Sequence, residues 1–448
     1  MSLIGRIKEQ IEKNPPRLLA FGFLLVILVG SIILSLPISS ASGEYTNLLD
    51  ASFTATSAVC VTGLATVNTL EYWSSFGHFI ILMLIQFGGL GFMTWAILIA
   101  LIMKKRITLK ERLVIHEQMN AISLQGMVRL VIYVLKATFI IEIAGAVLLG
   151  FTFIPRFGIG KGIWYSIFHS ISAYCNAGFD LIGSESLAPF AKSIMVILPI
   201  SFLIMIGGIG FSVIMDITSK KKFKHFTAHA KLALSVSATL VLTGMVIFFL
   251  LEYGNENTIK SFSLYDKILA SFFQSVTTRT AGFCALNQAM IRDSSAVVSI
   301  VLMFIGGSPA GTAGGVKTTT MGLLFYTTLS EIKGQSDVNM FNRRIPFNTV
   351  RKALAVVIIS MCWVLLITLI LTVTESNSFI NLLFEATSAF GTVGLSRSVT
   401  PTLTNVGKML IMITMYLGRL GPMTLAFAFT KRQTARTYRE PRGDILVG

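Results

Sequence analysis

The amino-acid sequence predicts an all-α membrane protein made of four tandem helix–pore loop–helix repeats, with eight transmembrane helices and four re-entrant P-loops. Of its 448 residues, 53% are hydrophobic and only 13% are charged, a composition typical of membrane proteins. Apolar runs near the roughly 20 residues that cross a bilayer recur along the whole chain. One glycine-centred motif recurs between paired runs, which indicates a duplicated unit.

The apolar runs supply the predicted transmembrane helices. They cover residues 17–36, 79–103, 128–153, 195–215, 232–251, 297–324, 353–373 and 409–429. The first run is longer than the apolar core of a signal peptide, and seven further runs follow it. We therefore expect an uncleaved first helix.

Basic residues are concentrated on one side of the predicted membrane. The net charge is +16, and 25 of the 37 Lys and Arg lie in the two terminal segments and in the loops at 102–129, 218–231 and 331–352. Loops rich in Lys and Arg face the cytoplasm, so both termini and these loops are expected there. A basic surface at the membrane accounts for the charge, and we expect the lipid bilayer rather than nucleic acid as its partner.

A fourfold internal repeat organises the chain. The gaps between paired runs align on one glycine each, with a Phe ten residues earlier and a Leu or Phe directly after. The glycines are Gly63, Gly178, Gly282 and Gly394, and the phenylalanines are Phe53, Phe168, Phe272 and Phe384. Three of the four segments also have Ser six residues before the glycine, namely Ser57, Ser172 and Ser388. We expect repeats at residues 1–127, 128–230, 231–350 and 351–430, followed by a cytoplasmic tail at 431–448.

Each gap is expected to enter the membrane partway and return. In the first gap, about twelve helix-compatible residues before Cys60 would span only about 18 Å. A returning non-helical strand leaves backbone carbonyls unsatisfied, which is tolerated where they are buried in protein or line a hydrated path. Four such strands around one pseudo-fourfold central pore would supply rings of carbonyls that replace the water shell of a monovalent cation. Glycine suits this geometry because a side chain would crowd the axis.

The predicted filter therefore consists of four strands that contribute backbone carbonyls. Its residues are Cys60, Val61, Thr62 and Gly63; Cys175, Asn176, Ala177 and Gly178; Arg279, Thr280, Ala281 and Gly282; and Gly391, Thr392, Val393 and Gly394. The side chains of Asn176 and Arg279 are expected to point outward. A cation on the axis would repel the ion, so Arg279 should pair with a carboxylate or with pore-helix carbonyls behind the filter.

The second helix of each unit carries further glycines near mid-membrane. They lie in the segments Gly88-Gly89-Leu90-Gly91, Gly207-Gly208-Ile209-Gly210, Gly306-Gly307-Ser308-Pro309 and Gly418-Arg419-Leu420-Gly421. For the first two segments the expected role is close helix packing.

The sixth apolar run contains the predicted gate, a loop at residues 304–320. The stretch from Phe304 to Lys317 has five glycines and a proline, so it cannot form a regular helix. The gate candidates are Gly306, Gly307, Gly311, Gly314, Gly315 and Lys317, with Arg419 from the last helix. A static kink that completes the packing is the alternative. A phosphate-binding loop is excluded because Val316 separates the glycine from Lys317.

Arg419 occupies the position that glycine holds in the other three units. A buried arginine needs a partner. Two interpretations remain open at this stage: a structural pair with a carboxylate such as Glu385 or Glu142, or an electrostatic barrier on the pore axis beneath the filter.

The motifs resemble those of the Trk/Ktr/HKT superfamily of cation channels and transporters. The strings that carry the resemblance are VCVTGL, YCNAGF, TRTAGF and GTVGL, together with GGLGF and GGIGF, and the match covers essentially the whole chain. The size, the basic loops and the eight runs are most similar to a bacterial Ktr-type potassium uptake membrane subunit. Glycine at all four filter positions implies potassium, because in that family serine at the first position accompanies sodium transport.

The resemblance also implies partners and regulation. A loop in the second helix of the third repeat would obstruct the pore, and a basic residue in the last helix would oppose it. The subunit would form a homodimer in the bacterial plasma membrane, on a cytoplasmic ring of RCK/KTN-type subunits that bind ATP and ADP. Nucleotide is expected only on that ring. No covalently bound cofactor is expected in this chain, K⁺ at the filter is the metal ion expected, and sodium dependence stays open.

Two other functional classes fit less well. A secondary carrier coupled to Na⁺ or H⁺ usually has acidic residues within its spans and inverted repeats, whereas Glu142 is the one acid clearly inside a long run and the units share one orientation. An enzyme is not expected, because the sequence has no nucleophile motif and no His-Glu or Cys-His cluster. His169 is expected to be a hydrogen-bonded structural residue.

Overall fold

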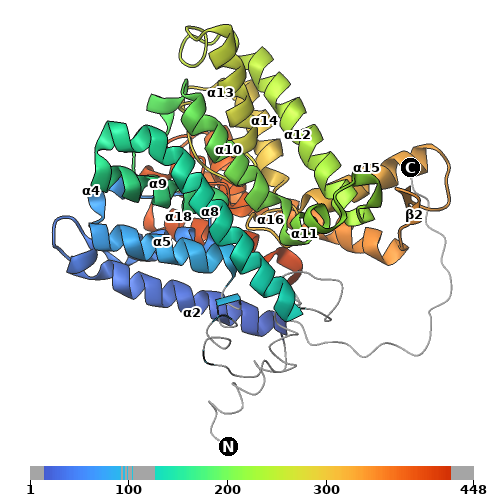
Figure 1. Cartoon of the computed structure of the whole chain (residues 1–448), viewed down its shortest axis with the longest axis horizontal. Coiled ribbons are helices and arrows are strands. Elements are labelled where there is room, and N and C mark those ends of the chain that lie inside the picture. Colours follow the sequence, from blue (N-terminus) through green and yellow to red (C-terminus); the bar gives the residue numbers. More distant parts are fainter. Residues whose placement is uncertain (1–14, 92–93, 96–97, 99–102, 104–126, 425–448) are drawn as a thin grey trace, which may run out of the picture.

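A computed structural model describes residues 15–91, 94–95, 98, 103 and 127–424. The described secondary structure is helical apart from a small antiparallel hairpin of β1 (Asn339–Met340) and β2 (Arg343–Arg344). The helices form one assembly in which the hairpin and α15 (Thr318–Ile332) project to one side (Figure 1). The predicted tail at 431–448 and most of the basic loop at 102–129 lie outside the described residues.

Four long helices begin the four sequence units. They are α2 (Pro15–Ser35), α8 (Met127–Phe157), α12 (Ala228–Glu252) and α16 (Phe347–Thr374). Within the described part of the chain these are the four helices long and apolar enough to cross a membrane, or five spans if one bent pair is included. Their bounds lie close to those of the first, third, fifth and seventh apolar runs.

A short helix follows each long one and ends at the predicted filter. These helices are α3 (Leu48–Cys60), α9 (Ile159–Tyr174), α13 (Leu264–Thr277) and α17 (Phe379–Gly391), each packed against the long helix of its own unit. Polar caps fix some of their starts: the side chain of Asn47 accepts a hydrogen bond from the amide of Leu49, and that of Ser263 from the amide of Asp266.

The third helix of each unit joins it to the next unit. These helices are α5 (Ser75–Leu90), α10 (Ile194–Ile209), α14 (Asp293–Phe304) and α18 (Asn405–Leu420). α5 packs against α9, α10 against α13, α14 against α17, and α18 against α3. Because the last contact returns to the first unit, the four units close into a ring around the short helices.

Within the part of the chain that the structure describes, a helix ends inside each of the expected spans at 79–103, 195–215 and 409–429. In these units the third helix ends at Gly91, Gly210 and Gly421, whose φ angles of +80°, +97° and +83° break the helix. After Gly210 the chain turns by 97° into α11 (Phe211–Lys220). Only the interruption of the sixth run was predicted, and there a loop separates α14 from α15.

Short elements complete the described chain and connect the helices. They are the 3₁₀ turns η1 (Pro37–Ser39), η2 (Ala188–Phe190), η3 (Phe223–His225) and η4 (Thr400–Thr402), and the single-turn helix α4 (Thr69–Tyr72).

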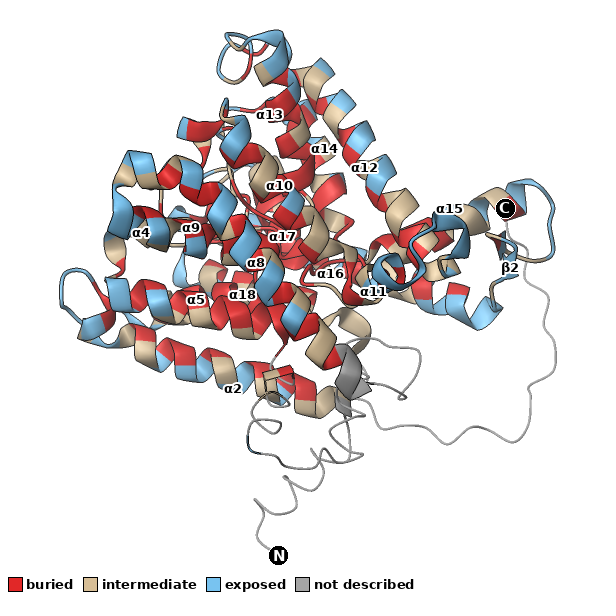
Figure 2. Cartoon of the chain, in the orientation of Figure 1, coloured by how far each residue is buried: buried red, intermediate tan, exposed pale blue. Residues whose placement is uncertain are grey.

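Burial is greatest along the short helices and least along the outward faces of the long ones (Figure 2). In α3 every residue from Phe53 to Cys60 is buried. Large apolar side chains on the long helices are instead exposed, with Phe151 72% and Val373 84% accessible. A chain whose outer surface is this apolar suits a hydrocarbon solvent rather than water.

Glycines allow the third helices to approach the short helices at equivalent places. A Cβ on Gly88 would overlap the carbonyl oxygen of Val59, one on Gly207 that of Tyr174, and one on Gly418 that of Phe390. Each of these carbonyls lies four residues before the aligned glycine of its unit. The predicted packing role of the Gly-Gly segments is therefore seen at Gly88 and Gly207.

Replacing Gly88 by alanine is expected to reduce the amount of folded protein. In an unhindered helix this change stabilises by about 1 kcal/mol, but here the added methyl group meets backbone that cannot move aside. Gly160 in α9 is the matched control because nothing lies within 4 Å of its Cβ position. Thermal unfolding of the detergent-purified proteins should show a lower Tm for Gly88→Ala and an equal or higher Tm for Gly160→Ala. Equal melting of both variants would contradict the packing role.

Candidate functional site

The four aligned glycines form a closed ring at the centre of the molecule. A Cβ on Gly63 would lie 2.5 Å from the carbonyl oxygen of Ala177 and 3.0 Å from the Cα of Gly178. A Cβ on Gly178 would contact Ala281 and Gly282 in the same way. The cycle then runs from Gly282 to Val393 and Gly394, and from Gly394 back to Thr62 and Gly63. Segments more than 100 residues apart in sequence therefore meet around one centre.

The strands share a backbone conformation although their sequences differ. The residue two positions before each glycine is in the left-handed region, with φ of +58° at Val61, +60° at Asn176, +66° at Thr280 and +50° at Thr392. Such torsions are rare for residues other than glycine and costly for β-branched ones. The surrounding structure must therefore impose this conformation on all four strands.

Hydrogen bonds to the preceding helix hold each strand. The residue before the glycine donates its amide to the end of the short helix, as Thr62 does to the carbonyl of Ser57 at 2.8 Å and Val393 to that of Ser388 at 2.8 Å. Ala177 makes the equivalent bond to Ser172 at 2.7 Å, and Ala281 bonds Thr277 at 3.1 Å. The strand amides therefore point back into the protein.

Side-chain hydroxyls add a second set of bonds. The Oγ atoms of Ser57 and Ser388 accept from the amides of Gly63 and Gly394 at 3.0 and 3.1 Å. In the other two units, Ser172 and Thr277 donate their hydroxyls to the carbonyl after the glycine, each at 2.7 Å.

Replacing Ser57 by alanine is expected to weaken the first strand. The amide of Gly63 would lose its acceptor, which costs about 1–3 kcal/mol for a buried donor. Thermal unfolding of the purified protein should therefore show a lower Tm than wild type. Ser42→Ala is the control, because Ser42 lies in an exposed turn and, among the described residues, bonds only its neighbours Ser40 and Glu44. A Tm for Ser57→Ala equal to that of Ser42→Ala would contradict the role of this hydroxyl.

In each strand, the carbonyl of the residue before the aligned glycine lacks a donor in the part of the chain that the structure describes. Within the described residues, no hydrogen bond reaches the carbonyl oxygens of Thr62, Ala177, Ala281 or Val393, which are the oxygens that face the glycine of the neighbouring strand. Buried carbonyls almost always have a partner. Four unpartnered oxygens around one centre, with the C-terminal ends of four helices beside them, create a site of negative potential that suits a cation.

The two unusual side chains of the predicted filter point away from the ring. Asn176 is fully buried and lies within hydrogen-bond distance of Thr280 Oγ1 in the adjacent strand, at 3.2 Å. Arg279 donates to the carbonyl and Oγ of Ser237 in α12, at 3.3 and 3.1 Å, and to the carbonyl of Gly306 at 3.5 Å. Among the described residues it has no carboxylate partner. Its acceptors are the hydroxyl and carbonyl of Ser237 in α12 and a carbonyl of the loop, rather than the expected carboxylate or pore-helix carbonyls.

The loop between α14 and α15 is anchored to its neighbours by backbone hydrogen bonds. The amide of Ser308 donates to Gly208 at 2.8 Å and that of Thr312 to Gly207 at 3.2 Å, which ties the loop to the end of α10. A short bridge between Ile305 and Val316 closes its base. The loop therefore has a defined conformation formed largely by main-chain contacts.

The tip of the loop lies directly against the predicted filter strands. Thr312 donates its hydroxyl to the carbonyl of Tyr174 at 3.2 Å, at the end of α9. On the other side, a Cβ on Gly314 would overlap the side chain of Thr392, and the Cβ position of Gly315 is 3.2 Å from the Cα of Gly391. A side chain at Gly314 would therefore have to displace the side chain of Thr392 in the fourth strand.

Arg419 connects the loop to the first unit. Its guanidinium donates to the carbonyl of Thr312 and to the carbonyls of Gly88 and Gly89, the last at 3.1 Å. The carboxylates considered as partners are engaged elsewhere: Glu142 accepts from Gln86 at 2.8 Å, and Glu385 accepts from Ser396 at 2.7 Å and from Thr400. Arg419 therefore bonds neither Glu142 nor Glu385.

Lys317 ends the loop and adds a second cation near Arg419. Its Nζ donates to the carbonyl of Ala313 at 2.6 Å, so the Lys317 ammonium group stays within the loop.

His169, the expected structural histidine, contacts the carbonyl of Tyr165 and accepts a hydrogen bond from the amide of Leu181. It therefore holds the chain that follows the predicted filter strand of the second unit.

Some features of the site could not be recognised in the sequence. The hydrogen bonds made by the hydroxyls of Ser57 and Ser388 could have been anticipated from the sequence, because Ser recurs six residues before the aligned glycine. The contact made by Thr312 could not have been anticipated, since a threonine in a glycine-rich loop follows no distinctive sequence pattern. The carbonyl partners of Arg419 come from residues more than 100 positions away, and no local pattern encodes them.

Comparison with known protein families gives one match over most of the chain. The family model described as TrkH, cation transport protein, matches residues 23–438.

Curated relatives match over nearly the full length. The chain is 41% identical over 450 residues to the potassium/sodium uptake protein NtpJ of Enterococcus hirae, with 99% of each chain covered. It is 40% identical over 443 residues to the Ktr system potassium uptake protein B of Bacillus subtilis, again with 99% of each covered. Among solved structures, the potassium transporter TrkH from Vibrio parahaemolyticus superposes with a TM-score of 0.72 at 20% identity, covering 92% of this chain and 85% of that one. At that identity the superposition shows a shared fold.

Proposed function

This chain belongs to the TrkH family of cation transport proteins, and from that premise we propose that it takes up potassium across the plasma membrane through a gated, potassium-selective pore. The observation that carries the proposal is the closed ring of strands around Gly63, Gly178, Gly282 and Gly394, with its unpartnered carbonyl oxygens. Both relatives compared above are named for potassium uptake.

Selectivity follows from the rigidity of the ring. The amides of the strands donate hydrogen bonds to carbonyls of the preceding short helices. The hydroxyls of Ser57 and Ser388 accept from the amides of the aligned glycines and fix the ends of two strands. The carbonyl oxygens are thus held at set positions where they can substitute for the hydration shell of K⁺. The residues proposed to supply these oxygens are the four strand segments 60–63, 175–178, 279–282 and 391–394.

The proposed topology follows the four units. Each long helix spans the membrane, each short helix is a pore helix whose strand returns, and each third helix with its continuation completes a second span, giving eight spans. The proposed repeats are residues 1–127, 128–230, 231–350 and 351–430. The basic segments then lie on the cytoplasmic side with both termini.

The loop 304–320 is proposed to be the gate. It lies against the filter strands and is held by Arg419, so a cation would meet both the loop and two positive side chains on leaving the filter. The charges of Arg419 and Lys317 oppose passage of K⁺ in this conformation. Arg419 thus acts as a tether and as a barrier at once.

The membrane potential is sufficient to drive uptake. It supplies about 2.3 kcal/mol per charge per 100 mV, so a passive gated pore needs no fuel-binding domain in this chain. A secondary carrier is not favoured, given that the relatives are named as uptake proteins and the units repeat in one orientation. Only one of the two names includes sodium, so sodium dependence is left to experiment.

Regulation is proposed to come from a cytoplasmic partner. We propose a homodimer bound to a ring of nucleotide-binding subunits that responds to ATP and ADP, as the Ktr resemblance implies. Exposed basic residues at the end of α11 (Lys220, Lys221 and Lys222) and in the β1–β2 hairpin (Arg343 and Arg344) offer docking surfaces. The mass of the purified complex measures this assembly directly.

Growth of a potassium-uptake-deficient bacterium tests the function. Expression of the wild-type chain should restore growth on low potassium and produce Rb⁺ uptake that stops when the membrane potential is collapsed. Repeating the uptake with and without sodium separates the two ion dependences. Correct membrane insertion without growth or Rb⁺ uptake, with a Ktr-type regulatory subunit co-expressed, would contradict the proposal.

A further inference from the structure

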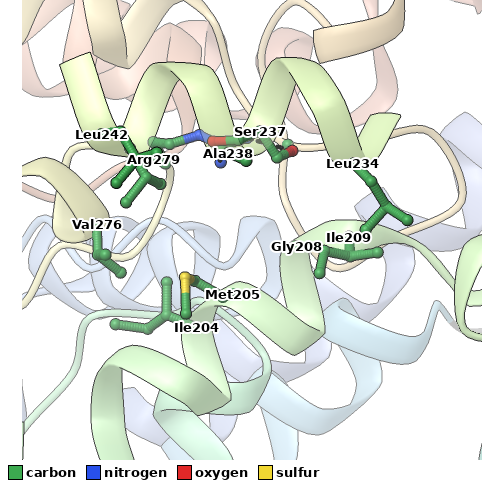
Figure 3. Close-up of a pocket in the computed structure, with 12 residues that line it drawn as sticks. Ile204, Met205, Gly208, Ile209, Leu234, Ser237, Ala238, Leu242, Val276 and Arg279 are labelled. Atoms are coloured by element: carbon green, nitrogen blue, oxygen red, sulfur yellow. Dashed lines mark hydrogen bonds between the residues drawn. The ribbon is translucent and has the colours of Figure 1, made fainter. Parts of the chain in front are cut away.

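A cavity of about 320 Å³ lies between α10 and α12, where the second and third units meet (Figure 3). Ile204 and Met205 of α10 form one wall, and Leu234 and Leu242 of α12 form the opposite wall. Val241 of α12 also lines the cavity. Gly307 of the loop and Arg279 of the third filter strand complete it. The cavity is large enough for a small ligand.

The wall of the cavity is almost entirely hydrocarbon. Its two polar side chains, Ser237 and Arg279, bond each other through Arg279 Nη2 and Ser237 Oγ at 3.1 Å. In Figure 3 the side chain of Arg279 runs along α12 toward Ser237. Nη1 and Nη2 of Arg279 are thus engaged with Ser237 of α12, whereas its Nε has no hydrogen-bond partner among the described residues.

The mouth of the cavity opens on the apolar outer surface. Leu242 is 60% exposed and Ala238 is exposed, both on a helix long and apolar enough to span the membrane. Water gains too few polar partners in such a space, and an empty cavity of this size forfeits dispersion contacts along its whole wall. At this depth hydrocarbon is the surrounding solvent.

We propose that the acyl chain of a membrane phospholipid inserts between α10 and α12 and fills this cavity. The chain would lie against Gly307 and against Arg279, whose guanidinium also reaches the carbonyl of Gly306 at 3.5 Å. The site therefore places a lipid chain directly behind both the third filter strand and the base of the loop. Lipid composition then acts on the loop by packing rather than by charge.

Photo-crosslinking of the full-length protein tests this site. The probe is a phosphatidylglycerol that carries a diazirine midway along one acyl chain, incorporated into vesicles with the purified protein. After irradiation and proteolysis, mass spectrometry should find labelled Met205 and Leu234. Ala238→Trp and, independently, Val241→Phe fill the cavity and should lower labelling of Met205 on the order of tenfold, corresponding to about 1.4 kcal/mol of lost binding.

The control is Val246→Trp, which introduces the same indole at an exposed position of α12 that does not line the cavity and should leave Met205 labelling unchanged. A parallel experiment uses a free fatty acid that carries the same diazirine, and it distinguishes a free fatty acid from a phospholipid acyl chain as the occupant. Absence of label at Met205 and Leu234 in wild type, equal labelling in the filled variants, or labelling by the fatty acid alone would each overturn the proposal. The readout does not depend on potassium transport, so its failure is distinguishable from failure of the proposed function.

Discussion

Replacing Gly63 by serine is expected to abolish the preference for potassium and to lower uptake at low potassium on the order of tenfold or more. The added Cβ would meet the Ala177 carbonyl oxygen at 2.5 Å and the Gly178 Cα at 3.0 Å. The residue would also be forced to keep φ near +94°, which costs about 1–3 kcal/mol for a residue other than glycine. Relief of the steric contact or of the strained φ would move the backbone and displace a carbonyl oxygen of the ring. A ring with one displaced oxygen no longer matches K⁺.

Gly43→Ser is the matched control for this change. Gly43 has a similar φ of +73°, but nothing lies within 4 Å of its Cβ position. Uptake of Rb⁺ and Na⁺ should be measured for both variants at equal membrane expression. Wild-type selectivity in Gly63→Ser, or an equal loss in Gly43→Ser, would contradict the role of the ring.

Replacing Arg419 by alanine is expected to raise uptake in the absence of any regulatory subunit by about tenfold or more. The substitution removes hydrogen bonds to the carbonyls of Thr312, Gly88 and Gly89, each worth about 1.5–3 kcal/mol when the donor is charged. It also removes one of two positive charges beside the pathway. The loop would then leave its present position more often, and K⁺ would meet a lower barrier.

Two further variants define the cause. Arg419→Lys keeps the charge but loses the forked geometry, so its uptake should fall between wild type and alanine if both tether and charge contribute. Lys260→Ala removes an exposed lysine paired with Glu256 and should leave uptake unchanged. Unchanged basal uptake in well-expressed Arg419→Ala would exclude a gating role.

The ring of strands could be anticipated from residues that recur at fixed spacing. The aligned glycines meet in space, because in each unit a Cβ at this position would contact the backbone of the neighbouring strand. They are Gly63, Gly178, Gly282 and Gly394. The break of the sixth run was likewise visible, since five glycines and a proline cannot continue a helix.

Other features depend on tertiary contacts that override local preference. The chain around Gly91 and Gly210 is apolar enough to suggest a continuing helix, and only the positive φ of these glycines reveals the break. Val61 and Thr392 are β-branched and locally disfavour the left-handed conformation that they adopt. Of the two interpretations of Arg419, the pair with a carboxylate such as Glu385 or Glu142 is not formed, because three distant carbonyls are its partners. The barrier beneath the filter stays a prediction.

Location of bound ions by anomalous scattering from Rb⁺ or Tl⁺ tests the central claim most directly. An experimental map of the protein soaked with either ion should show density on the axis, coordinated by the carbonyl oxygens of Thr62, Ala177, Ala281 and Val393. Density that avoids this ring, or carbonyls turned away from its centre in the presence of the ion, would contradict the account.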